Sequence, residues 1–400
     1  MNNLLAQIFE KQLKIFFLLA CLIWAVTTFG IWKKYDWNPS SMVGFGKEFA
    51  FKNWEETPKN AILFQGREGD LGAGYDGQIF YYYSRTITRG DSNWPNGFDE
   101  SYRAPRIGYP LLISIFGFFG PWGSIFGMYF WNVFLFFLSF FALRELLSPE
   151  NKALSFLYLF NPFSLNSYAV LVSDSIVASL VILSIWAFHK QKWLMFLFLG
   201  NILMITKEPA VFFIFPLGLR ALYYRRFNHA ILILSTLGAF LIWQIYLAQK
   251  FPNWRAGRLM DFIIPMEGIG KYLANFWTDF SRETISSREL VKSGSRFPLV
   301  LFFVLSFVTL ILGNWKKGVE WKLAYALSLL LIAMAGYFYY WSVYDNVSRM
   351  FLYTTLAIIL AKNSDSKLRI DILGLSLFAI LLLYLFRVLI FSRALEFQLS

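Results

Sequence analysis

The chain has 400 residues, of which 57% are hydrophobic and only 16% are charged. Its mean hydropathy of +0.49 is too high for a water-soluble surface, so the composition excludes an ordinary soluble enzyme and favours a protein dissolved in the lipid bilayer. The net charge of +12 would fit nucleic-acid binding in a soluble protein. Here, however, Lys and Arg lie in short gaps between apolar runs, which is typical of cytoplasmic loops and argues against a nucleic-acid partner.

Cysteine and histidine are rare, which narrows the chemistry. The single cysteine, Cys21, excludes a disulfide within one chain, and the two histidines, His189 and His229, flank basic loops. Zinc sites and Ser-His-Asp catalysis are therefore disfavoured. We expect any catalysis to rest on carboxylates, Arg or Lys. A divalent cation such as Mg or Mn would find carboxylates to bind, although no spacing in the sequence demands a metal.

Eleven apolar segments can cross a bilayer when tilt and local thinning are allowed. They cover residues 15–32, 122–143, 152–165, 171–188, 193–206, 209–223, 229–249, 297–313, 321–340, 347–361 and 370–391. The first segment follows two lysines, as in a signal peptide, but it contains no small-residue cleavage site. We therefore expect it to be a retained helix.

The gaps between these segments are either basic or nearly free of Lys and Arg. The basic gaps are the N-terminus and residues 144–152, 190–192, 220–226, 316–322 and 362–369. If successive helices alternate in direction, every basic gap lies on one side of the membrane, the cytoplasmic side. This holds only if the apolar run 107–120 does not cross. That run is short and contains Gly and Pro, so it predicts a re-entrant or interfacial helix.

The predicted fold is therefore all-α, a polytopic transmembrane helical bundle of about eleven spans plus one re-entrant or interfacial helix. The whole chain, residues 1–400, forms a single integral membrane domain. Two outer loops, 33–121 and 250–296, are rich in aromatic and charged residues, as expected for helices at a membrane interface. No low-complexity tract or fixed-period repeat is visible.

The first outer loop carries an acidic residue in a glycine-rich run. Asp76 stands in the sequence YDGQ, and Gly69, Gly72, Gly74 and Gly77 give the backbone the freedom to approach a ligand. A carboxylate there can accept a proton or hold a divalent cation, and Gln78 can hydrogen-bond a hydroxyl group. The alternative is that Asp76 caps a helix that begins near Gln78, and a cap does not exclude catalysis.

Two arginines precede the run 107–120. Arg103 and Arg106 occupy a position where an arginine side chain ordinarily extends to the lipid headgroups. The functional alternative is that the two guanidinium groups form a cradle for a lipid phosphate.

Later segments place ionisable residues at outer helix ends. Asp174 interrupts an apolar stretch, Lys207 and Glu208 are adjacent at a helix break, and Asp345 and Arg349 lie four residues apart. Each pair could be an ordinary local ion pair. Because charges in or beside membrane helices are energetically unfavourable, their convergence on one face instead predicts a shared polar cavity.

At this point the motifs are similar to a known group. YDGQ at 75–78, together with YRAPRIGYPLL at 102–112, resembles bacterial membrane proteins of the GT-C glycosyltransferase superfamily, closest to the mannosyltransferase-like and cell-surface glycopolymer formation families. NPFSLNSYAVLVSD at 161–174, TKEP at 206–209 and the Asp345/Arg349 pair also look like that group. The similarity covers most of the chain, and the first-loop motifs are its specific part.

The resemblance implies a GT-C-like fold and an inverting transferase in the bacterial inner membrane. Its donor would be a polyprenyl-phosphate sugar and its acceptor a lipid, glycan or protein on the periplasmic side. Asp76 matches the loop acid that acts as the base, and Arg103 and Arg106 match the basic motif near the donor phosphate. The chain departs from many members because no adjacent acidic pair occurs between Arg67 and Gln78.

The expected mechanism needs cations at the departing phosphate and a base at the incoming hydroxyl. We assign Lys207 or Arg349 to assist the arginine clamp, and Glu208 or Asp174 to orient those cations or sugar hydroxyls. A transporter or flippase for lipid-linked glycans is the competing class, and it predicts charges at midplane depth and two related halves. A non-catalytic scaffold for envelope assembly is a third alternative.

Overall fold

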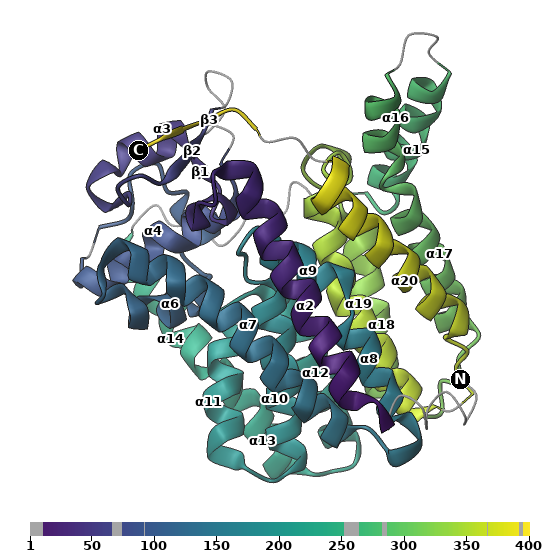
Figure 1. Ribbon diagram of the computed structural model, residues 1–400. Coiled ribbons are helices and arrows are strands. Elements are labelled where there is room, and N and C mark those ends of the chain that lie inside the picture. Colours follow the sequence, from purple (N-terminus) through teal and green to yellow (C-terminus); the bar gives the residue numbers. More distant parts are fainter. Residues whose placement is uncertain are drawn as a thin grey trace.

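The computed structural model describes residues 11–65, 74–91, 93–251, 264–281, 286–365, 367–391 and 395–400. Gly69 and Gly72 of the first-loop glycine run lie outside the described residues, as does part of the second predicted outer loop. The described chain is almost entirely helical (Figure 1).

The helices before the middle of the chain are α2 (Leu13–Trp32), α3 (Lys47–Lys52), α4 (Asp76–Arg89), α5 (Glu100–Arg103), α6 (Gly108–Gly117), α7 (Gly120–Leu146), α8 (Ser155–Leu159), α9 (Pro162–Ala169), α10 (Asp174–His189) and α11 (Trp193–Met204). Those that follow are α12 (Val211–Tyr223), α13 (Phe227–Leu234), α14 (Gly238–Lys250), α15 (Glu267–Phe280), α16 (Ser287–Gly294), α17 (Phe297–Ile311), α18 (Val319–Met334), α19 (Tyr344–Ser364) and α20 (Asp371–Phe386). Short 3₁₀ and π turns extend several of them, including η5 (Glu208–Ala210) and the π segments η7 (Tyr337–Trp341) and η8 (Arg387–Phe391).

One small sheet corrects the all-α prediction. Strands β1 (Phe45–Gly46) and β2 (Ile62–Phe64) pair in parallel, and β3 (Phe397–Leu399) adds antiparallel to β2, with Phe64 opposite Phe397. The sheet ties the C-terminal residues to the first predicted outer loop (Figure 1). The strands are too short to carry a period-two hydrophobic pattern, so the sequence gives no signal for them.

The core of the bundle is formed by α10 and α19. Every residue from 174 to 185 and every residue from 347 to 361 is buried. Helices α7 and α11 pack on α10, and α18 packs on α19. Helix α19 contains polar residues yet is buried, because its surroundings are other helices rather than solvent or lipid.

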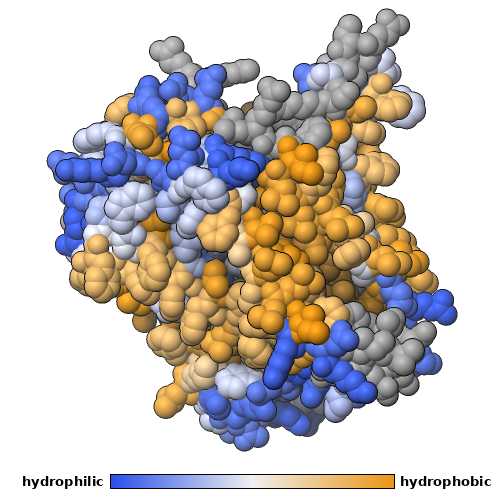
Figure 2. Space-filling model, in the orientation of Figure 1, coloured by the Kyte–Doolittle hydropathy of each residue, from blue (hydrophilic) through white to orange (hydrophobic). Residues whose placement is uncertain are grey.

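The outer helices expose large apolar side chains. Leu18 of α2 is 67% exposed, Ile242 of α14 is 71% exposed and Leu375 of α20 is 70% exposed. On the face that Figure 2 draws, an apolar belt lies between two hydrophilic ends. An apolar surface of this extent is unfavourable in water and typical of contact with lipid.

Within the part of the chain that the structure describes, four helices are long and apolar enough to cross a membrane, namely residues 13–35, 120–146, 227–250 and 371–390. Several shorter apolar helices accompany them. The apolar helices indicate a membrane protein and confirm the prediction of a membrane helical bundle in this coarse form. Helix occurs in each of the eleven predicted segments, but crossing by all eleven stays a prediction.

Three of the six predicted basic gaps meet at one end of the bundle. Lys190, after α10, pairs with Glu145 at the end of α7 at 3.2 Å. The backbone N–H of Ser148, after α7, donates to Asn363 near the end of α19 at 2.9 Å. We call this end, which contains residues 144–152, 190–192, 362–365 and 367–369, the basic end. These gaps therefore share one end, as alternating helices would require.

The apolar run 107–120 forms α6 and a tight turn into α7. Ten helical residues extend about 15 Å, half the thickness of a hydrocarbon core. The two helices run antiparallel, because the Trp131 indole donates to the Leu112 carbonyl at 2.7 Å and the Asn132 amide donates to the Tyr109 hydroxyl at 2.8 Å. The run thus turns back on itself, while its re-entrant or interfacial placement in a membrane stays a prediction.

Candidate functional site

Five charged side chains form one connected group, which we call the charge network. Arg103 Nη1 lies 2.7 Å from Asp76 Oδ1, and Arg349 Nη2 lies 3.6 Å from Asp76 Oδ2. Arg349 Nη1 also lies 3.4 Å from Asp174 Oδ2, and Lys207 Nζ lies 2.6 Å from Asp174 Oδ1. The network therefore joins α4, α5, α10, α19 and the break after α11.

The charge network lies at the end of the bundle opposite the basic end. Asp174 begins α10, whose last residues adjoin Lys190 at the basic end. Arg349 lies near the start of α19, which also ends at the basic end. The convergence of outer helix ends that the sequence predicts is thus present, and it brings Asp76, Arg103, Asp174, Lys207 and Arg349 together.

Helix geometry explains where the two aspartates lie. Asp76 is the first residue of α4 and Asp174 is the first residue of α10. A carboxylate in the first turn is stabilised by the positive end of the helix dipole. The residue before α4, Tyr75, makes no side-chain cap, and the helix begins at Asp76 itself. The Asp76 carboxylate therefore faces cations, and the alternative that it caps a helix beginning near Gln78 is wrong.

Gln78 and Gly77 serve packing within the chain. The Gln78 side-chain oxygen accepts a hydrogen bond from the Gly46 N–H at 2.9 Å, and the residue is only 3% exposed. A Cβ on Gly77 would lie 2.4 Å from the Val43 carbonyl oxygen and 2.8 Å from that of Val170. Gly77 is thus required because the chain's own backbone approaches it. Hydroxyl binding by Gln78 stays a prediction.

The electrostatics of Asp76 are set by its cations. Burial raises the pKa of this carboxyl, but the guanidinium groups of Arg103 and Arg349 outweigh burial and hold the pKa well below its usual range. Asp76 is therefore ionised at neutral pH. Its side chain is 34% exposed, so a ligand can reach it. As long as both cations contact it, the carboxylate is a weak proton acceptor.

Arg106 and Glu208 form a neighbouring pair. Arg106 Nε donates to both carboxylate oxygens of Glu208, at 2.9 and 3.1 Å. The guanidinium groups of Arg103 and Arg106 both lie over the ring of Tyr102, at 4.8 and 4.3 Å from its centre. The two arginines therefore lie together, as a phosphate cradle requires, and each contacts a carboxylate.

The local ion pairs that the sequence offered as alternatives do not form. Arg387 donates to both oxygens of Asp345 at 2.8 Å, whereas Arg349 Nε donates to the Asp345 backbone carbonyl at 2.9 Å. Likewise Lys207 turns to Asp174 and the adjacent Glu208 turns to Arg106. Both local-pair interpretations are wrong because each side chain faces a different helix. Asp345 therefore belongs to a separate pair with Arg387.

Sequence reasoning missed two aromatic residues of the site. The Tyr353 hydroxyl donates to Asp174 Oδ1 at 2.8 Å. The ring of Tyr75 lies 5.2 Å from the Arg349 guanidinium, and its hydroxyl donates to Asn346. Tyr353 stands four residues after Arg349 on the same helix face, so helical spacing is a signal that could have found it.

The donor set of the charge network does not fit a divalent cation. The part of the chain that the structure describes contains no group of three or more His, Cys, Asp or Glu side chains that could hold a metal. The two aspartates are bridged by Arg349, and Lys207 contacts the second of them. Metal-binding carboxylates ordinarily direct their oxygens at one shared point.

No family model, curated protein or solved structure matches the chain. The resemblance to GT-C enzymes therefore stays a prediction.

Proposed function

We propose that the chain is a membrane glycosyltransferase of the GT-C type. It moves a sugar from a polyprenyl-phosphate donor to an acceptor of the cell envelope, a lipid, glycan or protein, on the non-cytoplasmic face of a bacterial inner membrane. The observation that carries the proposal is the charge network of Asp76, Arg103 and Arg349 at the non-basic end of an apolar bundle. A lipid donor anchored in the bilayer can present its phosphate at this end of the bundle.

Sugar transfer from a phosphate donor requires cations and a base, and the charge network contains both. The acceptor oxygen forms a bond to the anomeric carbon, and the bond from that carbon to the phosphate oxygen breaks with inversion. The electron pair leaves with the phosphate, where cations stabilise the growing negative charge. The acceptor hydroxyl gives its proton to a base. Arg103, Arg349 and Lys207 supply the cations and Asp76 supplies the base.

Charge balance supports an exchange of partners on donor binding. Together with Arg106 and Glu208, the site has four cations against three carboxylates. A donor phosphate accepts bidentate hydrogen bonds from Arg as a carboxylate does, so it can replace Asp76 on Arg103. Once the phosphate occupies that cation, the pKa of Asp76 rises and the carboxylate becomes a better proton acceptor. The ion pair thus holds the base inactive until the donor is bound.

A transporter or flippase for lipid-linked glycans is the alternative. It would need polar groups along a path through the bundle, with charges at midplane depth. In the described residues the charged pairs lie near the helix ends, whereas contacts deeper in the bundle are uncharged, such as Tyr158 with Ser139 at 2.8 Å and with Ser179 at 3.1 Å. Such hydroxyl contacts are ordinary between membrane helices. This distribution favours transfer over transport.

The test is a transfer assay with the full chain in liposomes. Polyprenyl-phosphate sugars serve as donors and a membrane glycan fraction as acceptor, and the release of polyprenyl phosphate is measured. We expect Asp76→Asn to lower the rate by a factor of about 100 to 10,000, as loss of a general base does. Glu267→Gln, which removes a surface pair with Lys271, is the control and keeps the rate. Full activity of Asp76→Asn would exclude Asp76 as the base.

A further inference from the structure

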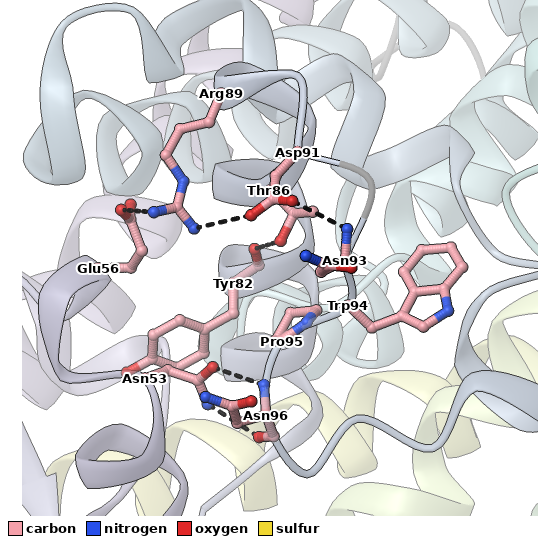
Figure 3. A pocket seen from close by; sticks show the side chains of 10 residues that line it. All are labelled: Asn53, Glu56, Tyr82, Thr86, Arg89, Asp91, Asn93, Trp94, Pro95 and Asn96. Carbon is pink, nitrogen blue, oxygen red and sulfur yellow. Dashed lines mark hydrogen bonds and ion pairs between the residues drawn. The ribbon is translucent and has the colours of Figure 1, made fainter.

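A cavity of about 170 Å³ opens on the first predicted outer loop (Figure 3), and none of its lining residues belongs to the charge network. It is lined by three asparagines, two carboxylates and one arginine, namely Asn53, Asn93, Asn96, Glu56, Asp91 and Arg89. The proposed transferase chemistry uses none of them. Its size is close to the roughly 150 Å³ that admits one six-membered ring in an engineered protein cavity.

The polar groups at both ends of the cavity are held in place. At one end Glu56 Oε1 lies 2.8 Å from Arg89, and its other oxygen lies 2.7 Å from Arg85. At the other end the Asn53 amide donates to the Asn96 carbonyl at 3.0 Å, and the Asn96 N–H donates to the Asn53 side chain at 2.8 Å. Figure 3 shows the two groups facing each other across the cavity. Fixed hydrogen-bonding groups bind a ligand with little loss of side-chain entropy.

Trp94 anchors the loop that forms the remaining wall. Its ring lies 5.4 Å from that of Phe98 and 4.9 Å from that of Phe251. Figure 3 shows this ring directed away from the lining amides. The loop that carries Asp91 and Asn93 is therefore attached to an aromatic cluster, and the cavity wall has a defined position.

The lining selects a class of ligand. One arginine, itself paired with carboxylates, does not make a phosphate site, and the polar side chains do not suit an acyl chain. Amides and carboxylates donate and accept hydrogen bonds with hydroxyl groups. The Asn93 side chain makes no hydrogen bond to any other described residue. Asp91 Oδ1 accepts a hydrogen bond from the Asn93 N–H at 2.9 Å, and Asp91 Oδ2 lies 3.9 Å from Arg89. The Asn93 amide and the remaining acceptor positions of Asp91 therefore have capacity for a ligand. A neutral six-membered ring with several hydroxyls, a pyranose sugar, fits these properties.

We propose that this cavity binds one sugar residue of the acceptor, so that the acceptor is a glycan chain. The inference rests on the proposed transferase function and names its acceptor class. Tyr82, Thr86 and Arg89 line the cavity and lie on the helix that begins at Asp76. They are roughly 9 to 20 Å from Asp76 along the helix axis, on a face turned by about 110°. One sugar cannot occupy both places, but a chain of several residues can.

Binding is measured first, without any donor. The purified full chain is applied to an array of neutral oligosaccharides of one to six pyranose residues. We expect binding that Asn93→Ala weakens about fivefold, as loss of one hydrogen bond does, and that Asn93→Trp abolishes by filling the cavity mouth. Gln65→Ala removes an exposed amide of the same outer loop and binds like the unchanged protein. The proposal would be overturned if no oligosaccharide bound, or if every oligosaccharide that bound did so equally well to the Asn93→Trp variant.

The transfer assay then separates the cavity from the chemistry. For acceptors of several sugar residues, Asn93→Ala should raise KM about fivefold and leave kcat unchanged. For single-sugar acceptors, KM and kcat should be the same in Asn93→Ala and in the unchanged protein. If oligosaccharides bind but no donor sugar is transferred, the transferase function fails and the cavity stands. If transfer occurs but neither Asn93 variant changes KM for acceptors of any length, the assignment of the cavity is wrong and the transferase function is retained.

Discussion

Ion pairs occur at both ends of the bundle, and the pair of Lys322 with Asp365 at the basic end is closed. Lys322 and Asp365 lie 2.7 Å apart with side chains that are 0% and 1% exposed. The Lys322 ammonium also donates to the carbonyl oxygens of Asn314 and Lys317, and Asp365 accepts from the Asn314 N–H at 3.0 Å. These partners all belong to the chain itself, so the Lys322–Asp365 pair connects the loop before α18 with the end of α19.

The charge network at the other end is open on one side. Asp174 is only 2% exposed, whereas Arg103 is 21%, Asp76 34% and Glu208 56% exposed. Exposure thus rises from the bundle core towards Asp76 and Glu208. The comparison shows that ion pairing alone does not separate structural from functional charges. Solvent access is a further requirement for function, because a ligand can replace a partner only where solvent reaches it.

The largest contrast should appear in stability. Asp365→Ala leaves the Lys322 charge buried without a carboxylate, and loss of one partner of a buried pair lowers the free energy of unfolding by about 3 to 5 kcal/mol. Asp76→Asn removes a partly exposed charge, for which a change of at most about 1 kcal/mol is expected. Reversible chemical unfolding in detergent measures both values.

The same two variants should reverse their order in transfer activity. Asp365→Ala, assayed well below its unfolding transition, is expected to keep its rate, while Asp76→Asn loses it. Equal losses of stability in the two variants would mean that Asp76 is as closely held as the Lys322–Asp365 pair, and the distinction drawn from exposure would be wrong.

The sequence predicted the helices and the apolar character of the bundle because hydropathy is a local property, while crossing by all eleven segments stays a prediction. Each apolar segment contains helix, and the basic gaps that the structure connects share one end. The sheet was not predicted, because Phe64 and Phe397 are separated by most of the chain and their strands are only three residues long. Pairing over that distance depends on the finished fold, which no local pattern contains.

The residues of the charge network were all singled out from the sequence, but their partners were not, and their role in a site stays a prediction. Asp174, Lys207 and Arg349 were found because charges are rare among apolar residues. Their partners depend on which helix ends meet, so Asp345 turned out to bind Arg387 rather than the residue four positions away. The glycine of YDGQ was assigned to a ligand, whereas it accommodates the backbone of Val43.

Arg349 bridges both aspartates, so its removal should have the next largest effect. Arg349→Gln loses charged hydrogen bonds of about 1.5 to 3 kcal/mol, which corresponds to a kcat/KM for the donor that is lower by about 10- to 150-fold. Arg349→Lys keeps the charge without the two-sided fork and should be intermediate. Steady-state kinetics with varied donor concentration measures both. Lys271→Gln, from a surface pair, is the matched control, and unchanged kinetics of Arg349→Gln would remove this residue from the donor site.

Arg103→Gln tests the electrostatic control of Asp76 by pH. Arg103 holds the pKa of Asp76 below its usual range, so the wild-type carboxylate stays ionised as the pH falls through the ordinary range for Asp. Without this cation the pKa rises, and the acid limb of the kcat/KM profile should move to higher pH. Profiles are normalised to their maxima, since the variant also loses a phosphate contact. An unshifted acid limb would show that Asp76 is not the titrating base.

The smallest effect is expected at Tyr353, which contacts Asp174 and no exposed group of the charge network. Tyr353→Phe removes one of the bonds that hold Asp174, while Lys207 and Arg349 remain in contact with it. Loss of one hydrogen bond of about 1 kcal/mol predicts about a fivefold lower kcat/KM. Tyr325→Phe is the matched control, because the Tyr325 hydroxyl is also buried and donates to the Ser306 carbonyl at 2.7 Å, away from the site.

The two tyrosine variants locate the boundary between the closed and open parts of the charge network. Both remove a buried hydroxyl and should lower stability by similar amounts. If only Tyr353→Phe lowers kcat/KM, the orientation of Asp174 is transmitted through Arg349 to Asp76, and the whole charge network acts in transfer. If neither variant changes kcat/KM, Asp174 has a structural role like that of Asp365. In that case Arg349 belongs to the functional part of the site and Asp174 does not.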